Sequence, residues 1–126
     1  MDNAISWFEI PATDLDRATT FYEAILSTEL IPLDMGDDMR MRMFPVSSPE
    51  AVGGAIVYSP DLLKPSGTDG VMIYLNANPD LSVVLSKVEA AGGQIALPKT
   101  VITEEFGYMG ILIDTEGNRI GLHSMA

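Results

Sequence analysis

The sequence predicts an α+β protein made of two tandem βαβββ modules, which form curved mixed sheets around a cleft. The order of one strand, one helix and three strands is readable twice along the 126 residues. The apolar stripes of the two helices begin at Leu15 and Leu81, about half the chain length apart. One helix covers only one face of a four-stranded sheet, so the other face of each sheet needs a second cover. A cleft between two facing sheets satisfies this need.

The first module, about 1–58, opens with a strand, because side chains alternate between two faces from Ile5 to Pro11. A helix near 14–27 follows, where apolar residues recur at helical spacing. Thr13, with Asp16 three residues later, resembles a capping box at its start. Three strands are predicted between Glu29 and Tyr58, separated by the polar turns 34–38 and 47–50.

A linker rich in Pro, Gly and Asp covers 59–69 and separates the first module from the second, 70–126. The second module repeats the plan. Asn78 as cap and Pro79 at the first helical position predict a helix near 79–91. The strands of this module are predicted at 71–76, 94–102, 108–114 and 119–124.

Charge and composition exclude several functions. Seven Lys and Arg face eighteen Asp and Glu, for a net charge of −11, which disfavours nucleic acids and anionic membranes as partners. No apolar run is long enough to span a membrane, and the start lacks a basic segment followed by an apolar one. We therefore expect a cytoplasmic protein. Without cysteine and with one histidine, a single chain cannot build a thiolate nucleophile, a zinc–sulfur site or a three-histidine site.

Two segments resemble a known family. The stretch from Trp7 to Tyr22, with Asp-Leu-Asp-Arg at 14–17 followed by Phe-Tyr, resembles the opening of vicinal oxygen chelate proteins. The stretch from Asp114 to Leu122, with its Asp-Thr-Glu-Gly-Asn turn, resembles their last turn and strand. This superfamily includes glyoxalases, bleomycin resistance proteins and extradiol dioxygenases. The resemblance implies paired βαβββ modules around a cupped cleft.

Metal-dependent members of that family hold a divalent cation with His, Gln or Glu side chains on the first and last strands of each module. The resemblance places these positions on Trp7, Met72, Gly121 and a residue between Gly54 and Ile56. None of these residues is an oxygen or nitrogen ligand of the usual kind. We therefore expect no metal cofactor.

Strand alternation gives a set of cleft-facing residues without reference to the family. If Phe8 and Ile10 face the helices, the residues between them face the cleft, and the same reasoning applies to the other strands. At 108–114 we expect Met109, Ile111 and Ile113 in the core, which turns Tyr108 inward to the cleft. The predicted substrate-binding residues are Trp7, Met72, Tyr74, Asn76, Tyr108 and Gly121.

Glu9 and His123 are the candidate catalytic residues. A carboxylate within an apolar strand needs hydrogen bonds or a cation, and His123 is predicted on the same cleft surface. Such a pair could hold a polar ligand or move a proton. The alternative is a structural pair, or a Glu at a solvated strand edge. Trp7 could stack on a planar ligand or fill the place of a metal.

Three functions remain open from the sequence. The first is a metal-free protein that binds a small, partly apolar molecule in the cleft between the modules. The second is a lyase, isomerase or dioxygenase-type enzyme of the same superfamily, using Glu9 and His123. The third is a non-catalytic module for protein interaction. Because each sheet leaves one face to cover, a homodimer is expected.

Overall fold

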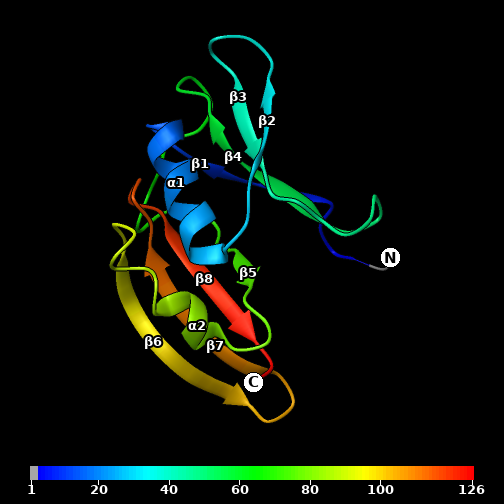
Figure 1. Ribbon diagram of the computed structural model, residues 1–126, viewed down its shortest axis with the longest axis vertical. Coiled ribbons are helices and arrows are strands. Elements are labelled where there is room, and N and C mark those ends of the chain that lie inside the picture. The colour runs from blue at the N-terminus through cyan, green and yellow to red at the C-terminus, as the bar shows by residue number, and fades with distance from the viewer. Residues whose placement is uncertain (1–2) are drawn as a thin grey trace.

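Two four-stranded mixed sheets, each carrying one helix, make up the chain (Figure 1). This computed structural model describes residues 3–126. The first sheet has the order β1-β4-β3-β2, with β1 (Trp7–Pro11), β4 (Gly53–Tyr58), β3 (Arg40–Met43) and β2 (Ile31–Asp34). The second has the order β5-β8-β7-β6, with β5 (Tyr74–Asn76), β8 (Arg119–Ser124), β7 (Gly107–Ile113) and β6 (Gln94–Thr103). In each sheet the first strand runs parallel to the last strand of its module, and the remaining pairs are antiparallel. The predicted fold class and element order are confirmed.

Helix α1 (Leu15–Leu26) lies where the sequence predicts it, but its cap is Asp14 rather than Thr13. The Asp14 carboxylate accepts a hydrogen bond from the Arg17 backbone N–H at 3.0 Å. The backbone N–H of Thr13 donates instead to Glu116, a residue of the second module. The predicted capping box is therefore wrong, because Asp14 caps the helix and the Glu116 carboxylate binds the Thr13 backbone N–H.

Helix α2 (Leu81–Leu85) is shorter than the predicted 79–91, and its cap is Asp80 rather than Asn78. After Leu85 the chain continues as turns up to Gly92. The backbone bonds there reach three residues back, as from Val88 N–H to Leu85 C=O at 3.1 Å. The chain after Leu85 is thus wound more tightly than an α-helix, but its apolar residues still recur on one side. This explains why the periodicity predicted a longer helix.

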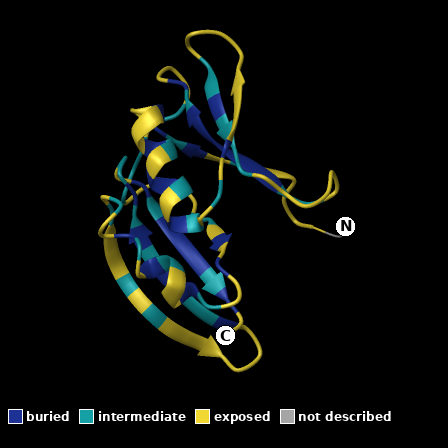
Figure 2. Cartoon of the chain, viewed as in Figure 1, coloured by how far each residue is buried: buried dark blue, intermediate teal, exposed yellow. Residues whose placement is uncertain are grey.

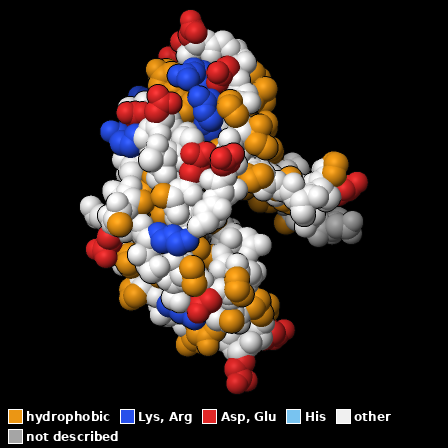
Figure 3. Space-filling model, viewed as in Figure 1, with side chains coloured by type: hydrophobic (Ala, Val, Ile, Leu, Met, Phe, Trp, Pro, Cys, Tyr) orange, Lys and Arg blue, Asp and Glu red, His pale blue; other side chains and the backbone are white. Residues whose placement is uncertain are grey.

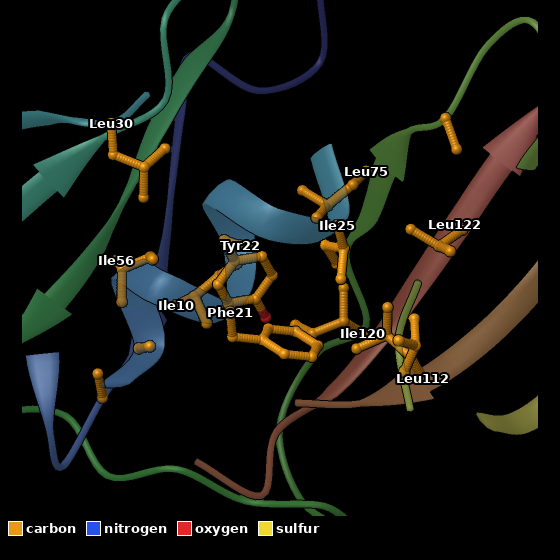
Figure 4. Packing of buried hydrophobic residues seen from close by; sticks show 14 of the residues in the cluster. Ile10, Phe21, Tyr22, Ile25, Leu30, Ile56, Leu75, Leu112, Ile120 and Leu122 are labelled. Carbon is orange, nitrogen blue, oxygen red and sulfur yellow. The ribbon is translucent and has the colours of Figure 1, made fainter. Parts of the chain in front are cut away.

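One hydrophobic core joins the two modules. Helix α1 packs on the first sheet, helix α2 packs on the second, and the two helices contact each other (Figure 1). Figure 4 shows Phe21 and Tyr22 of α1 between Ile56 of the first sheet and Leu112 of the second. The helix-facing sides of both sheets thus point toward a shared centre, and their outer faces point away from it. Figure 2 shows that the edge strands β2 and β6 are exposed along much of their length.

The turn between β7 and β8 connects the modules at the start of α1. The Glu116 carboxylate, whose side chain is fully covered, accepts hydrogen bonds from the backbone N–H groups of Thr13 and Asp14 at 2.9 and 2.7 Å. It also pairs with the Arg17 guanidinium, whose Nε lies 2.7 Å from Oε2. Burial alone would raise the pKa of Glu116, but the Arg17, Asp14 and Thr115 hydrogen bonds outweigh it and lower this pKa below 4.5.

Replacing Glu116 by Gln is expected to lower the free energy of unfolding by about 2 kcal/mol at pH 7, because the charge-assisted bonds to Arg17 are lost. A carboxyl with a lowered folded pKa stabilises the fold above its unfolded pKa, and this contribution disappears as pH falls through the folded pKa. The difference between the two proteins should therefore shrink toward pH 3. Urea unfolding at both pH values measures it, with exposed Glu89→Gln as the control. An equal loss for both variants at pH 7, or a loss that persists undiminished at pH 3, would contradict this role.

Candidate binding site

The outer face of the first sheet carries Trp7 and Glu9, as strand alternation predicts. The Trp7 Nε1–H donates a hydrogen bond to Glu9 Oε2 at 3.2 Å, and both residues are exposed. On the same face, Met41 of β3 packs with Ala55 and Val57 of β4 in a second, smaller apolar cluster. Met39 and Met43 pack against this methionine cluster, so these methionines belong to the outer face and not to the shared core.

The outer face of the second sheet carries Tyr74, Asn76, Gly121 and His123. Tyr74 and Asn76 on β5 are register partners of Gly121 and His123 on β8. The Tyr74 ring, half exposed, covers Gly121 so closely that a Cβ at that glycine would lie 2.4 Å from a ring carbon. His123 Nε2 lies 2.6 Å from the Phe106 carbonyl oxygen, so the imidazole is engaged with the β6–β7 connection.

The prediction that Tyr108 faces the cleft is wrong. Tyr108 packs against the shared core, together with Leu112, which is fully buried, and Gly110, where a Cβ would meet Leu81 and Leu85. Both alternating sets on β7 are apolar, so its pattern contains no signal that separates core from outer face.

A charged residue of β6 covers Tyr108. Lys99 Nζ lies 4.4 Å from the centroid of the Tyr108 ring and 2.9 Å from Asp80 Oδ1. The hydrogen bonds of Ser82 and Lys99 lower the pKa of Asp80 to about 2, so this carboxylate is ionised at neutral pH. Tyr108 is thereby held on the helix side of the sheet.

Glu9 and His123 do not form a pair within one chain. Each is on the outer face of a different sheet, and no hydrogen bond or ion pair joins them within residues 3–126. The expectation that they share one interior surface fails because the two sheets meet through their helix sides. Met72 is half-buried just before β5 and borders neither of the two cavities described next.

The larger cavity, about 580 Å³, lies between the modules. One wall is the arm formed by Ile5, β1 and the β3–β4 connection, and the other is β5 with Tyr74, Leu75 and Asn76. Figure 3 shows the hollow between this arm and the lower half of the molecule. Two of the predicted binding residues, Tyr74 and Asn76, border it. Its lining consists of Ile5, Phe8, Leu26, Thr28, Phe44, Pro45, Val46, Ser47, Ala51, Val52, Tyr74, Leu75 and Asn76.

The aromatic side chains of this cavity come from both modules. Phe8 and Phe44 pack with ring centroids 5.5 Å apart, and Tyr74 enters from β5. Sequence reasoning assigned Phe8 to the core and did not single out Phe44. Both border the cavity because the arm extends beyond the end of α1, which leaves part of the helix-facing surface uncovered (Figure 1).

The smaller cavity, about 260 Å³, lies on the linker side of the modules. Glu9 borders it, together with Lys64 and Asp69 of the linker and Arg119 at the start of β8. Glu9 thus shares a cavity with Arg119 rather than with His123. Arg119 was not among the binding residues predicted from the sequence, because nothing in its local pattern marks it as one.

The positions where a metal would be expected do not supply ligands. The Trp7 indole is bound to Glu9, the Tyr74 ring covers Gly121, and a Cβ at Gly54 would collide with the Phe8 ring. In the described part of the chain, no three His, Cys, Asp or Glu side chains are arranged to hold a metal ion. Between residues 3 and 126, no helix has the length and apolar character that crossing a membrane requires.

Comparison with known proteins identifies the fold. No protein-family model matches the chain, and no curated protein matches it. Solved structures do match over nearly its full length. A glyoxalase/bleomycin resistance protein from Albidiferax ferrireducens T118 is 18% identical with a TM-score of 0.68, and the match covers 97% of this chain and 98% of that one.

Two further structures share the fold. TnmS3, an antibiotic binding protein from Streptomyces sp. CB03234, is 18% identical with a TM-score of 0.66, over 98% of this chain and 97% of that one. A glyoxalase I mutant from Zea mays is 16% identical with a TM-score of 0.69, over 94% of this chain and 45% of that one.

Replacing Gly121 by Ala is expected to push the Tyr74 ring toward the larger cavity and to cost about 1 kcal/mol of stability, since the ring is half exposed and can swing away. In a Tyr74→Ala background the same replacement should be neutral or stabilising, because alanine suits a strand better than glycine. Chemical denaturation of the two single variants and the double variant measures this coupling. Additive effects would show that the Tyr74 ring does not cover Gly121.

Proposed function

We propose that this protein binds a small, partly apolar molecule in the larger cavity between its modules, without a metal ion. The fold it shares with glyoxalase/bleomycin resistance proteins hosts more than one activity, so the fold alone does not indicate a ligand, whereas the cavity does. Its volume falls within the range of about 300–1,000 Å³ that is usual for small-molecule sites.

The side chains that line the larger cavity are the main support for the proposal. Phe8, Phe44 and Tyr74 offer aromatic surface, and Asn76 adds an amide among apolar neighbours. A ligand with an aromatic or aliphatic body and one or two polar atoms fits this lining. One structural neighbour is named an antibiotic binding protein, which supports binding without catalysis. Glu9 and His123, the candidate catalytic residues, are not in contact within residues 3–126.

A neutral aromatic alcohol, 2-naphthol, is a suitable probe. Titration followed by amide chemical shifts should show saturable changes at Phe8, Tyr74 and Asn76. Val46→Trp, at the cavity wall, should weaken binding at least tenfold because the indole fills the space. Val101→Trp places the same side chain on exposed β6, away from the cavity, and should leave the affinity unchanged.

The same titration separates the proposal from its alternatives. If Val46→Trp binds 2-naphthol as tightly as the unmodified protein, the larger cavity is not the site. If Glu9→Gln alone weakens binding instead, the ligand lies in the smaller cavity, which Glu9 borders. If both Glu9→Gln and His123→Ala weaken it, the ligand lies on the outer faces of the sheets and the superfamily-enzyme hypothesis gains support.

We also propose that the chain forms a homodimer through the outer faces of its sheets. Its accessible surface is 7433 Å², whereas a compact monomer of 13.6 kDa exposes roughly 6,600 Å². The excess is close to the roughly 800 Å² that each partner buries in a standard interface. Ile31 and Leu33 of β2 are 47% and 42% exposed, beside the methionine cluster of the first sheet. A second copy would cover this apolar surface and could bring its His123 toward Glu9.

Sedimentation velocity at 10 µM is expected to give a dimer for the unmodified protein. Leu33→Glu should shift it to monomer, because the new charge would be buried at the interface. Val83→Glu adds the same charge to the exposed side of α2 and should leave the dimer intact. A monomer for the unmodified protein, or equal effects of the two variants, would contradict the proposed interface.

A further inference from the structure

The smaller cavity is unusual in its charge. Four ionisable side chains border about 260 Å³, namely Glu9, Lys64, Asp69 and Arg119. No ion pair joins any of them to an oppositely charged side chain within residues 3–126. The rest of the lining is largely apolar, from Ile10, Pro11, Leu63, Val71, Ile73 and Ile120.

The pairing of Lys and Arg side chains across the chain also distinguishes this cavity. The protein has seven Lys and Arg against eighteen Asp and Glu, so a cation without an acidic partner is unexpected. In the described chain, Lys64 and Arg119 are the two that have neither a carboxylate nor a hydroxyl partner, and both border the smaller cavity. The five with such a partner are Arg17, Arg40, Arg42, Lys87 and Lys99.

Arg119 also has an unused donor. Within residues 3–126, its buried Nε has no hydrogen-bond acceptor, and its Nη2 has only a 3.5 Å contact with the Gly70 carbonyl oxygen. Leaving a buried donor of a charged group without an acceptor costs on the order of 1–3 kcal/mol. A ligand reaches this donor only if the side chain turns toward the cavity. The guanidinium edge that includes Nε then matches a carboxylate, which accepts two parallel hydrogen bonds from such a fork.

We propose that the smaller cavity binds a short aliphatic monocarboxylate, whose carboxylate pairs with Arg119 and is attracted by Lys64. The isoleucine, leucine and valine side chains of the lining contact the alkyl chain. The carboxylates of Glu9 and Asp69 balance the charges of Lys64 and Arg119 before a ligand binds. A dianion such as phosphate would leave excess negative charge in the cavity, which disfavours its binding. This site is separate from the larger cavity, and it does not depend on what binds there.

Butyrate is the probe, and the Arg119 Nε–H resonance is the readout in ¹⁵N-resolved spectra of the full chain. Butyrate should shift this resonance saturably, because the guanidinium turns toward the carboxylate and Nε gains an acceptor. Arg119→Gln should weaken butyrate binding at least tenfold, with the change then followed at the Ile73 and Ile120 amides. Arg119→Lys should restore part of the affinity, and Lys64→Gln should weaken binding a few-fold. Lys87→Gln, which removes a cation elsewhere, should have no effect.

Several results would overturn the proposal. Shifts that do not saturate, equal affinity for phosphate and butyrate, or unchanged affinity in Arg119→Gln would each show that no carboxylate site exists. If Arg119→Gln fails to fold, the Lys64→Gln and Lys87→Gln comparison decides, and equal affinities for these two variants would contradict the proposal.

Discussion

The hydroxyl of Tyr22 and the amide of Asn118 both bind the buried carboxylate of Asp114, and this contact ties the two modules together. Tyr22 Oη donates to Asp114 Oδ2 at 2.6 Å, and Asn118 Nδ2 donates to the same oxygen at 2.9 Å and to the Pro11 carbonyl at 2.7 Å. Burial, together with the negative charge of Asp114, raises the pKa of Tyr22 well above its usual value, so the phenol remains a donor at neutral pH. With the modules fixed in this way, their helix sides share one core and their outer faces diverge.

Both cavities follow from this arrangement. Each lies between the modules and combines residues far apart in the sequence, as Phe8 with Tyr74 in the larger cavity and Glu9 with Arg119 in the smaller one. The two differ in chemistry, since the larger is aromatic and aliphatic whereas the smaller carries charges of both signs. The diverging faces leave apolar side chains of the first sheet, among them Ile31 and Leu33, exposed.

Much of the fold was predictable because it depends on local pattern. The helical stripe of α1 and the strand alternation around Glu9 and Tyr74 assigned elements and faces correctly. The face of Tyr108 was not predictable, because both faces of β7 are apolar and α2 selects between them. The role of Glu116 at the start of α1 has no local signal, since the contact spans about a hundred residues. That the buried Nε of Arg119 lacks an acceptor within residues 3–126 is likewise evident only in the folded chain.

Native-state hydrogen exchange tests the shared core most directly. If the modules form one cooperative unit, amides of β4 in the first sheet and β8 in the second should exchange with the same opening free energy. Asn118→Ala should lower both values together, by about 2–3 kcal/mol, because three side-chain hydrogen bonds of the buried Asn118 are lost. The single-core arrangement would be contradicted if β4 amides exchanged through a separate, lower-energy opening while those of β8 stayed protected.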